Sequence, residues 1–132
     1  MVTRRRAAPR RKRAQPEHHF HVQVADLLTA LDGRGGRFFW TTFPAGERRS
    51  AMAGARWKRI GVKTGMPDIM IWTKGKCIGL ELKAKGGQIS AAQRLTHELL
   101  LEHRVTTFVV WDAPGVLDEL KAFINDIMRD GG

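Results

Sequence analysis

The sequence has few of the features that mark secreted, membrane-spanning or zinc-binding proteins. Its single cysteine, Cys77, cannot form an internal disulfide or supply a cysteine-rich zinc site. No apolar run approaches the roughly 18 residues that a membrane span needs. The N-terminus also lacks the apolar stretch of a signal peptide. These absences predict a soluble protein of the cytoplasm.

Acidic residues are scarce in two segments. The 132 residues carry 23 Lys+Arg against 13 Asp+Glu, a formal net charge of +10. Residues 1–13 hold seven basic residues and no acid, and residues 34–85 hold twelve basic residues and only Glu47, Asp68 and Glu81 as acids. A positive surplus of this size indicates a polyanion partner, with nucleic acid as the first choice.

The distribution of charge and apolar residues divides the chain into an arm and one domain. Residues 1–15 are predicted to form a flexible basic arm, because the run has a proline in its middle and no apolar anchor. Such an arm either keeps the protein soluble or follows the phosphates of a nucleic acid. Residues 16–132 are predicted to form one domain with its own core.

Hydrophobic periodicity predicts an alternation of helices and strands in residues 16–132. The expected fold is α/β, a single compact domain whose central mixed sheet is flanked by helices. Leu95, Leu99 and Leu100 are expected to point inward, and the tryptophans of the strands to lie in the core. The expected helices are 16–33, 50–60 (short), 90–103 and 114–128, and the expected strands are 37–43, 68–73, 76–83 and 105–111.

The strand pair 68–73 and 76–83 brings two of the three central acids together. If the connecting loop is Lys74-Gly75, Thr73 faces Lys76 and Asp68 lies opposite Glu81. Facing residues of an antiparallel pair have Cβ atoms about 5 Å apart, and like charges there are destabilising. Lys83 shares the face of Glu81, because side chains on a strand alternate.

A divalent metal between the two carboxylates is one explanation of this placement. Two carboxylates and a main-chain carbonyl leave positions open for water and a phosphate oxygen, as Mg²⁺ sites for phosphoryl transfer do. Lys83 is then placed to orient the attacking water or to offset charge on the phosphate. The alternative is a surface carboxylate cluster neutralised by Lys83 alone.

At these residues the sequence resembles the VRR-NUC (virus-type replication-repair nuclease) family of the PD-(D/E)xK nuclease superfamily. The matching stretches are Gly65-Met66-Pro67-Asp68, Glu81-Leu82-Lys83 and Ser90-Ala91-Ala92-Gln93, and the resemblance extends from Glu17 to about Trp111. One departure is the loop after the first strand, where members of the family often carry an asparagine and this chain has 43–48 (FPAGER).

The resemblance implies a restriction-endonuclease-like core, a Mg²⁺ or Mn²⁺ cofactor and roles for single residues. Asp68, Glu81, the main-chain carbonyl of Leu82 and Glu17 would hold the metal, and Lys83 would be the catalytic lysine. Gln93 would assist, although Ser90 and Gln93 also match the pattern of a capping box. Glu17 is equally explained as a charge that favours the first turn of a helix. The expected phosphate-binding residues are Arg48, Arg49, Arg56, Lys58, Arg59, Lys63 and Lys85.

Two other sites fit the sequence less well. His18, His19 and His21 with Cys77 lack the second closely spaced ligand pair of a zinc site, so these histidines line the first turn near the substrate or lie on the surface. The segment 33–36 lacks the GK[ST] of a P-loop. Trp57, in a basic segment, either stacks on a base or is buried.

The predicted function is therefore a metal-dependent, structure-selective DNA endonuclease. By resemblance it would be a homodimer that hydrolyses phosphodiester bonds of branched DNA such as Holliday junctions, in a bacterial or phage-infected cell. The alternative is a basic nucleic-acid-binding protein that keeps the nuclease scaffold but does not cut. Metal-dependent turnover separates the two.

Overall fold

The computed structural model describes residues 8–33, 36–43 and 51–131. The order of elements agrees with the predicted one. None of the described helices is both long and apolar enough to cross a membrane. The elements are α1 (Ala8–Asp32), β1 (Phe39–Thr42), α2 (Ala51–Arg59), β2 (Ile69–Thr73), β3 (Lys76–Lys83), α3 (Ala91–Glu102), β4 (Thr106–Trp111) and α4 (Val116–Gly131).

The four strands form one mixed sheet in the order β1-β2-β3-β4. The pairs β1–β2 and β2–β3 are antiparallel, whereas β3 and β4 are parallel and are connected through α3. Parallel neighbours need such a crossover, because the chain must return to the starting edge of the sheet. The predicted α/β class with a mixed sheet is confirmed.

The β2–β3 hairpin has the predicted register. Thr73 faces Lys76 across the two-residue loop Lys74-Gly75, and Ile69 faces Leu80 at the other end of the ladder. Gly75 has φ +75°, a conformation that a two-residue hairpin loop favours. Because the side-chain period of a strand is two, this register determines the face on which every side chain of the hairpin lies.

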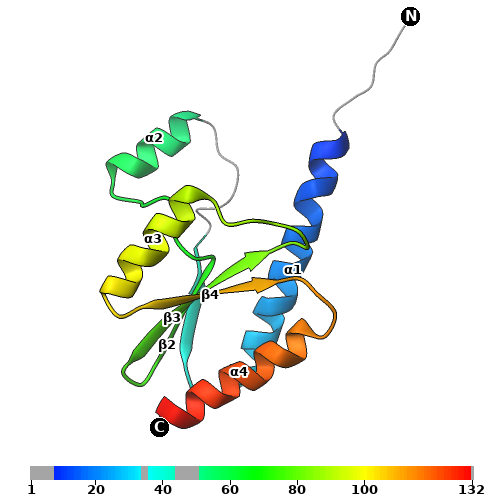
Figure 1. Ribbon diagram of the computed structural model, residues 1–132, viewed down its shortest axis with the longest axis vertical. Helices are drawn as coiled ribbons and strands as arrows, with labels where there is room; N and C mark the ends of the chain where they lie inside the picture. The colour runs from blue at the N-terminus through cyan, green and yellow to red at the C-terminus, as the bar shows by residue number, and fades with distance from the viewer. Residues whose placement is uncertain (1–7, 34–35, 44–50, 132) are drawn as a thin grey trace, which may run out of the picture.

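One face of the sheet carries the hydrophobic core. Helices α1 and α4 lie together on this side, and α2 and α3 lie on the other (Figure 1). Burial of this aliphatic surface is the main stabilising contribution in the molecule. The buried side chains of the cluster are Phe20, Val24, Leu28, Phe38, Ile69, Ile71, Ile78, Leu80, Leu82, Leu120 and Ile124.

Helix α3 turns a different side toward the sheet than the sequence predicts. Leu95 and Leu99 are 58% and 48% exposed, so the prediction that they point inward is wrong. The less exposed side chains at helical spacing are Gln93, Thr96, His97 and Leu100. Beneath them, Gln93 and His97 contact Glu81 of β3, a polar neighbour that suits these side chains better than leucines. The inward side of α3 is therefore specified by the polar site that it covers.

Two tryptophans predicted for the core lie on the surface. Trp72 is 38% exposed and Trp111 is 44% exposed, whereas Trp40 packs against the core cluster. Trp111 is on the edge strand β4, and its indole N–H donates to the carbonyl of Gly87 at 2.7 Å. Trp57 on α2 is half-buried.

Helix α1 begins earlier than the sequence predicts. It starts at Ala8 and includes Pro16, the predicted first residue of the helix, so residues 8–15 of the expected flexible arm are helical. Alanine, arginine, lysine and glutamine fill most of this segment and favour helix, which outweighs the hydrogen bond that Pro16 removes. The rest of the arm, residues 1–7, is outside the described residues.

Candidate metal and catalytic site

Asp68 and Glu81 come together at the open end of the β2–β3 hairpin. Asp68 directly precedes Ile69 and Glu81 directly follows Leu80, the last ladder pair, so the register extended by one residue places the two acids opposite each other as predicted. Oδ2 of Asp68 accepts a hydrogen bond from the main-chain N–H of Leu82 at 2.7 Å. This bond fixes the Asp68 carboxylate at the edge of β3, directly beside Glu81.

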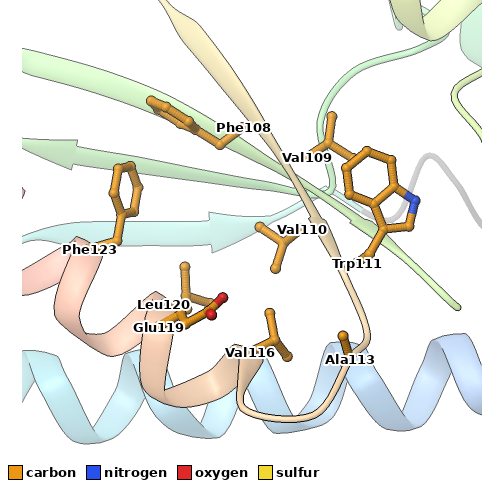
Figure 2. A pocket seen from close by; sticks show the side chains of 9 residues that line it. All are labelled: Phe108, Val109, Val110, Trp111, Ala113, Val116, Glu119, Leu120 and Phe123. Atoms are coloured by element: carbon orange, nitrogen blue, oxygen red, sulfur yellow. The ribbon is translucent and has the colours of Figure 1, made fainter.

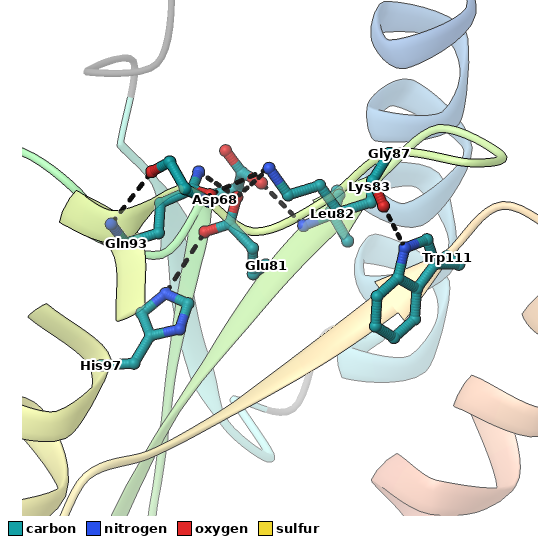
Figure 3. A network of polar contacts seen from close by, with 9 residues as sticks. Asp68, Glu81, Leu82, Lys83, Gly87, Gln93, His97 and Trp111 are labelled. Carbon is teal, nitrogen blue, oxygen red and sulfur yellow. Dashed lines mark hydrogen bonds and ion pairs between the residues drawn. The ribbon is translucent and has the colours of Figure 1, made fainter. Parts of the chain in front are cut away.

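Glu81 is the centre of a polar network that joins the sheet to α3 (Figure 3). Its side chain is only 2% exposed. Oε2 accepts from the Gln93 side-chain amide at 2.9 Å and lies 3.8 Å from Nζ of Lys83. Oε1 is 3.5 Å from Nε2 of His97, and neither of these two buried atoms has a hydrogen-bond partner. The network thus leaves one carboxylate oxygen without a donor.

The surroundings of Glu81 favour its neutral form. Burial is the largest cause, and the negative charge of Asp68 adds to it, so that the pKa of Glu81 rises from 4.5 to about 8 even though Lys83 acts in the opposite direction. The carboxyl is therefore favoured in its protonated form, and a cation bound beside it would favour the loss of that proton. Such displaced pKa values concentrate at functional sites.

Gln93 is part of the helix cap and also contacts the residues of the site, the two roles that the sequence left open. Its main-chain N–H donates to the Ser90 hydroxyl and its Oε1 accepts from the Ser90 N–H, which completes the capping box of α3. The same Oε1 accepts from Nζ of Lys83 at 2.9 Å, while Nε2 donates to Glu81. The helix cap therefore positions the amide that orients both Lys83 and Glu81.

His97 is a site residue that sequence reasoning missed. It lies one helical turn after Gln93 on the same side of α3, and its imidazole faces Glu81 (Figure 3). Burial and then the charge of Lys83 lower its pKa, so the ring favours the neutral form. The signal available in the sequence was its spacing of four residues from Gln93, which places both side chains on one face of a helix.

The donor set suits a hard divalent cation. Mg²⁺ is commonly held by one or two carboxylates, with water and phosphate oxygens as its other ligands. Asp68 and Glu81 could supply such carboxylates, and Oε1 of Glu81 has no hydrogen-bond partner. The N–H of Leu82 points toward Asp68, and a strand residue directs its N–H and C=O to the same side, so the predicted Leu82 carbonyl faces the pair as well.

A zinc site has less support. Within the described ranges, no three His, Cys, Asp or Glu side chains gather closely enough to hold a metal ion. His18 and His19 are exposed, and the His21 ring contacts the hydroxyl of Thr42 at 3.0 Å instead of Cys77. The histidines of α1 are therefore surface and packing residues here.

Glu17 lies on the exposed side of α1. It is close enough for its charge to be one of the causes that raise the pKa of Glu81, although the smallest of them. It is not gathered with Asp68 and Glu81 into a three-ligand group. Its assignment as a metal ligand stays a prediction.

The predicted phosphate-binding residues that are described all lie at the surface. Arg56, Lys58 and Arg59 form the last turn of α2, and Lys63 and Lys85 follow α2 and β3. Their exposure leaves them available to phosphate oxygens. Arg48 and Arg49 are outside the described residues.

Gly65 determines how closely the segment before Asp68 approaches α3. It has φ +79°, and a Cβ there would lie 2.4 Å from the carbonyl oxygen of Ala92. The Thr96 hydroxyl donates to the carbonyl of neighbouring Thr64 at 2.6 Å, which closes the same contact. The glycine of the predicted Gly-x-Pro-Asp motif is thus needed for packing.

We expect Gly65→Ala to lower the free energy of unfolding by about 2–3 kcal/mol, from backbone strain and the clash together. Gly75→Ala is a matched control, because Gly75 has φ +75° but no atom lies within 4 Å of the position that the alanine methyl would take. Chemical denaturation of both variants measures the difference. Equal losses would mean that the close approach to Ala92 contributes nothing.

An apolar cavity in the described part of the chain lies away from the Asp68–Glu81 pair. It has a volume of about 380 Å³ and lies between β4 and α4, with Phe108, Val110, Leu120 and Phe123 among its lining residues (Figure 2). Its lining includes Glu119 but no basic side chain. A nucleic-acid phosphate would be repelled there, whereas Lys83 stands beside the Asp68–Glu81 pair.

The fold and the site together define an α/β domain with a carboxylate pair, of which Glu81 is buried, and a lysine at the end of a hairpin. Among solved structures, the chain is similar to one described as a "VRR_NUC domain protein", with a TM-score of 0.58 and 20% identity over 84% of this chain and 86% of that one. No protein-family model and no curated protein matches the chain. The structural match confirms the predicted fold.

Proposed function

We propose that the protein is a metal-dependent nuclease of the VRR-NUC type that hydrolyses DNA phosphodiester bonds. The observation that carries this proposal is the Asp68–Glu81 pair, in which one buried oxygen of Glu81 has no donor and the other lies 3.8 Å from Nζ of Lys83. The net charge of +10 supplies the attraction for a polyanionic substrate.

The side chains divide the work of phosphodiester hydrolysis. A bound Mg²⁺ or Mn²⁺ supplies Lewis-acid activation of the scissile phosphate. Asp68 and Glu81 would hold the ion, with the Leu82 carbonyl as a further ligand. Lys83, held by Gln93, directs its ammonium toward the reacting phosphate and offsets the charge that develops there.

The substrate within this proposal is branched DNA, cut by a homodimer. The proposal of branched DNA and of a homodimer rests on the resemblance of the sequence to the VRR-NUC family. The basic end of α2 and Lys63 supply phosphate contacts on the same side of the sheet as α3, because the 61–67 segment packs against that helix. Mass measurement of the purified protein determines the oligomeric state.

Cleavage assays test the function directly. Four-way junction, flap and linear duplex DNA are incubated with the full chain and Mg²⁺ or Mn²⁺, and with EDTA. We expect metal-dependent cleavage that Asp68→Asn reduces at least about 100-fold, because the change removes a charged metal ligand. Glu98→Gln, at an exposed acid of α3, is the control and is expected to cut normally.

Unaltered cleavage by Asp68→Asn would refute the assignment of the site. Salt-sensitive DNA binding with no turnover under any metal condition would instead establish the binding protein on a nuclease scaffold. In that case Glu81→Gln is expected to bind DNA at least as well as the unmodified chain, since the variant cannot acquire a negative charge near the phosphates.

A further inference from the structure

Two aromatic side chains form an exposed pair on the sheet, away from the core. Phe39 of β1 and Trp72 of β2 are register partners and are 67% and 38% exposed. Their ring centroids are 5.7 Å apart with an angle of 39° between the planes. Large aromatic rings left in water on two paired strands are an unfavourable feature unless they have a binding role.

The pair shares a face of the sheet with the carboxylate site. Cys77 of β3 is the register partner of Trp72, and Glu81 follows Cys77 by four residues in the same strand, so the side chains of Trp72 and Glu81 point to the same side. At about 3.3 Å per residue, the two positions are about 13 Å apart along the strand. This distance corresponds to about four base steps of a stacked strand. A DNA strand held at Asp68 and Glu81 therefore reaches the aromatic pair within a few nucleotides.

The charge around the pair suits a polyanion. Strands β1 and β2 contain no acid, and exposed basic residues lie close to both rings along the chain. Lys74 follows Trp72 by two residues and Lys76 begins β3, whereas Arg37, two residues before Phe39, donates from Nη1 to the carbonyl of Leu31 at 2.9 Å. A second copy of the chain docked on this patch would bring these cations against their own counterparts, which disfavours self-association there.

We propose that Phe39 and Trp72 form a stacking subsite for an unpaired nucleobase of the DNA substrate. Aromatic rings bind the faces of unstacked bases of any sequence, while adjacent cations bind the backbone. The proposal rests on the proposed function and deepens it. It assigns the substrate class as DNA with unpaired nucleotides a few positions from the cut, such as a flap or an opened branch point.

The experiment measures DNA binding in EDTA, so that the result does not depend on cleavage. Fluorescence anisotropy compares a labelled single-stranded oligonucleotide with a fully paired duplex of the same length. For Phe39→Ala/Trp72→Ala we expect at least about a 10-fold weaker affinity for the single strand and less than about a 2-fold change for the duplex. Val22→Ala, at an exposed apolar residue of α1, is the control.

Three further measurements keep the test independent of any folding defect. Phe39→Leu/Trp72→Leu retains apolar side chains but removes the stacking faces, and it is expected to lose single-strand affinity equally. In the unmodified chain, an oligonucleotide containing 5-iodo-deoxyuridine is expected to photocrosslink to Phe39 or Trp72, located by mass spectrometry. Lys74→Ala is expected to reduce the salt dependence of single-strand binding without abolishing the crosslink.

Unchanged single-strand affinity in the double variants, or crosslinks confined to other residues, would overturn the subsite. Dissociation of a homodimer by Phe39→Ala/Trp72→Ala would also overturn it, because the patch would then be an interface between copies. Failure of the proposed nuclease function appears separately, as absence of metal-dependent cleavage while single-strand binding and the crosslink persist.

Discussion

In the metal-free protein, Glu81→Gln is expected to raise the free energy of unfolding above pH 8 while abolishing metal-dependent cleavage. Above pH 8 the unmodified chain must hold a buried, charged Glu81 beside Asp68, since the pKa of Glu81 is raised to about 8 by burial and by that neighbour. The glutamine is neutral and its oxygen still accepts from the Gln93 amide. Removing a catalytic carboxylate thus stabilises the fold.

The sign of the pH dependence follows from proton binding. A carboxyl with a higher pKa in the folded chain than its usual 4.5 binds its proton more tightly when folded. Its contribution to stability is complete below pH 4.5 and is lost as the pH rises through about 8, at up to about 1.4 kcal/mol per pH unit. Denaturant melts in EDTA at several pH values measure this slope, and subtraction of the Glu81→Gln slope removes the contribution of the five histidines.

Two controls accompany this measurement. Asp68→Asn retains an acceptor for the Leu82 N–H but removes the charge that raises the pKa of Glu81, so the loss of stability is expected at a lower pH. Added Mg²⁺ is expected to stabilise the unmodified chain at pH 8 but not Glu81→Gln. Identical slopes for the unmodified chain and Glu81→Gln would show that Glu81 titrates as an ordinary carboxyl.

The parts of the fold that follow local rules could be predicted from the sequence. The two-residue loop Lys74-Gly75 fixes the register of the hairpin, and this register places Asp68 opposite Glu81 and Ile69 against Leu80. The spacing of apolar residues on α1 and α4 likewise indicates the side that packs on the sheet. In both cases the information lies within one element or between two neighbouring ones.

The sequence could not predict which side of a helix or strand is buried where this depends on the element that packs against it. The pattern of Leu95 and Leu99 indicated a buried apolar stripe, but α3 covers a polar surface and turns Gln93 and His97 inward. Trp72 is a large aromatic residue of the kind expected in a core, yet its side chain is 38% exposed on the sheet. The spacing of four residues places His97 on the same face of α3 as Gln93, but that this face lies against Glu81 depends on how α3 packs on the sheet.

Replacement of Gln93 is expected to separate its structural from its catalytic contribution. Gln93→Glu retains an oxygen that accepts from the Ser90 N–H and from Nζ of Lys83, as a capping box allows. It has no amide N–H for Glu81 and adds a negative charge beside that carboxyl. We expect a melting temperature within a few degrees of the unmodified chain at pH 6, where Glu81 is protonated, and at least about a 10-fold loss of cleavage rate.

Ser90→Ala is the reciprocal control. It removes the hydroxyl that accepts from the Gln93 N–H and is expected to lower the free energy of unfolding by about 1 kcal/mol. The contacts of the Gln93 side chain with Lys83 and Glu81 remain, so the cleavage rate is expected to stay within about 3-fold. A role of Gln93 in orienting the site requires that Gln93→Glu lowers the cleavage rate much more than it lowers stability. If Ser90→Ala and Gln93→Glu instead showed the same ratio of lost cleavage to lost stability, Gln93 would act only as a helix cap.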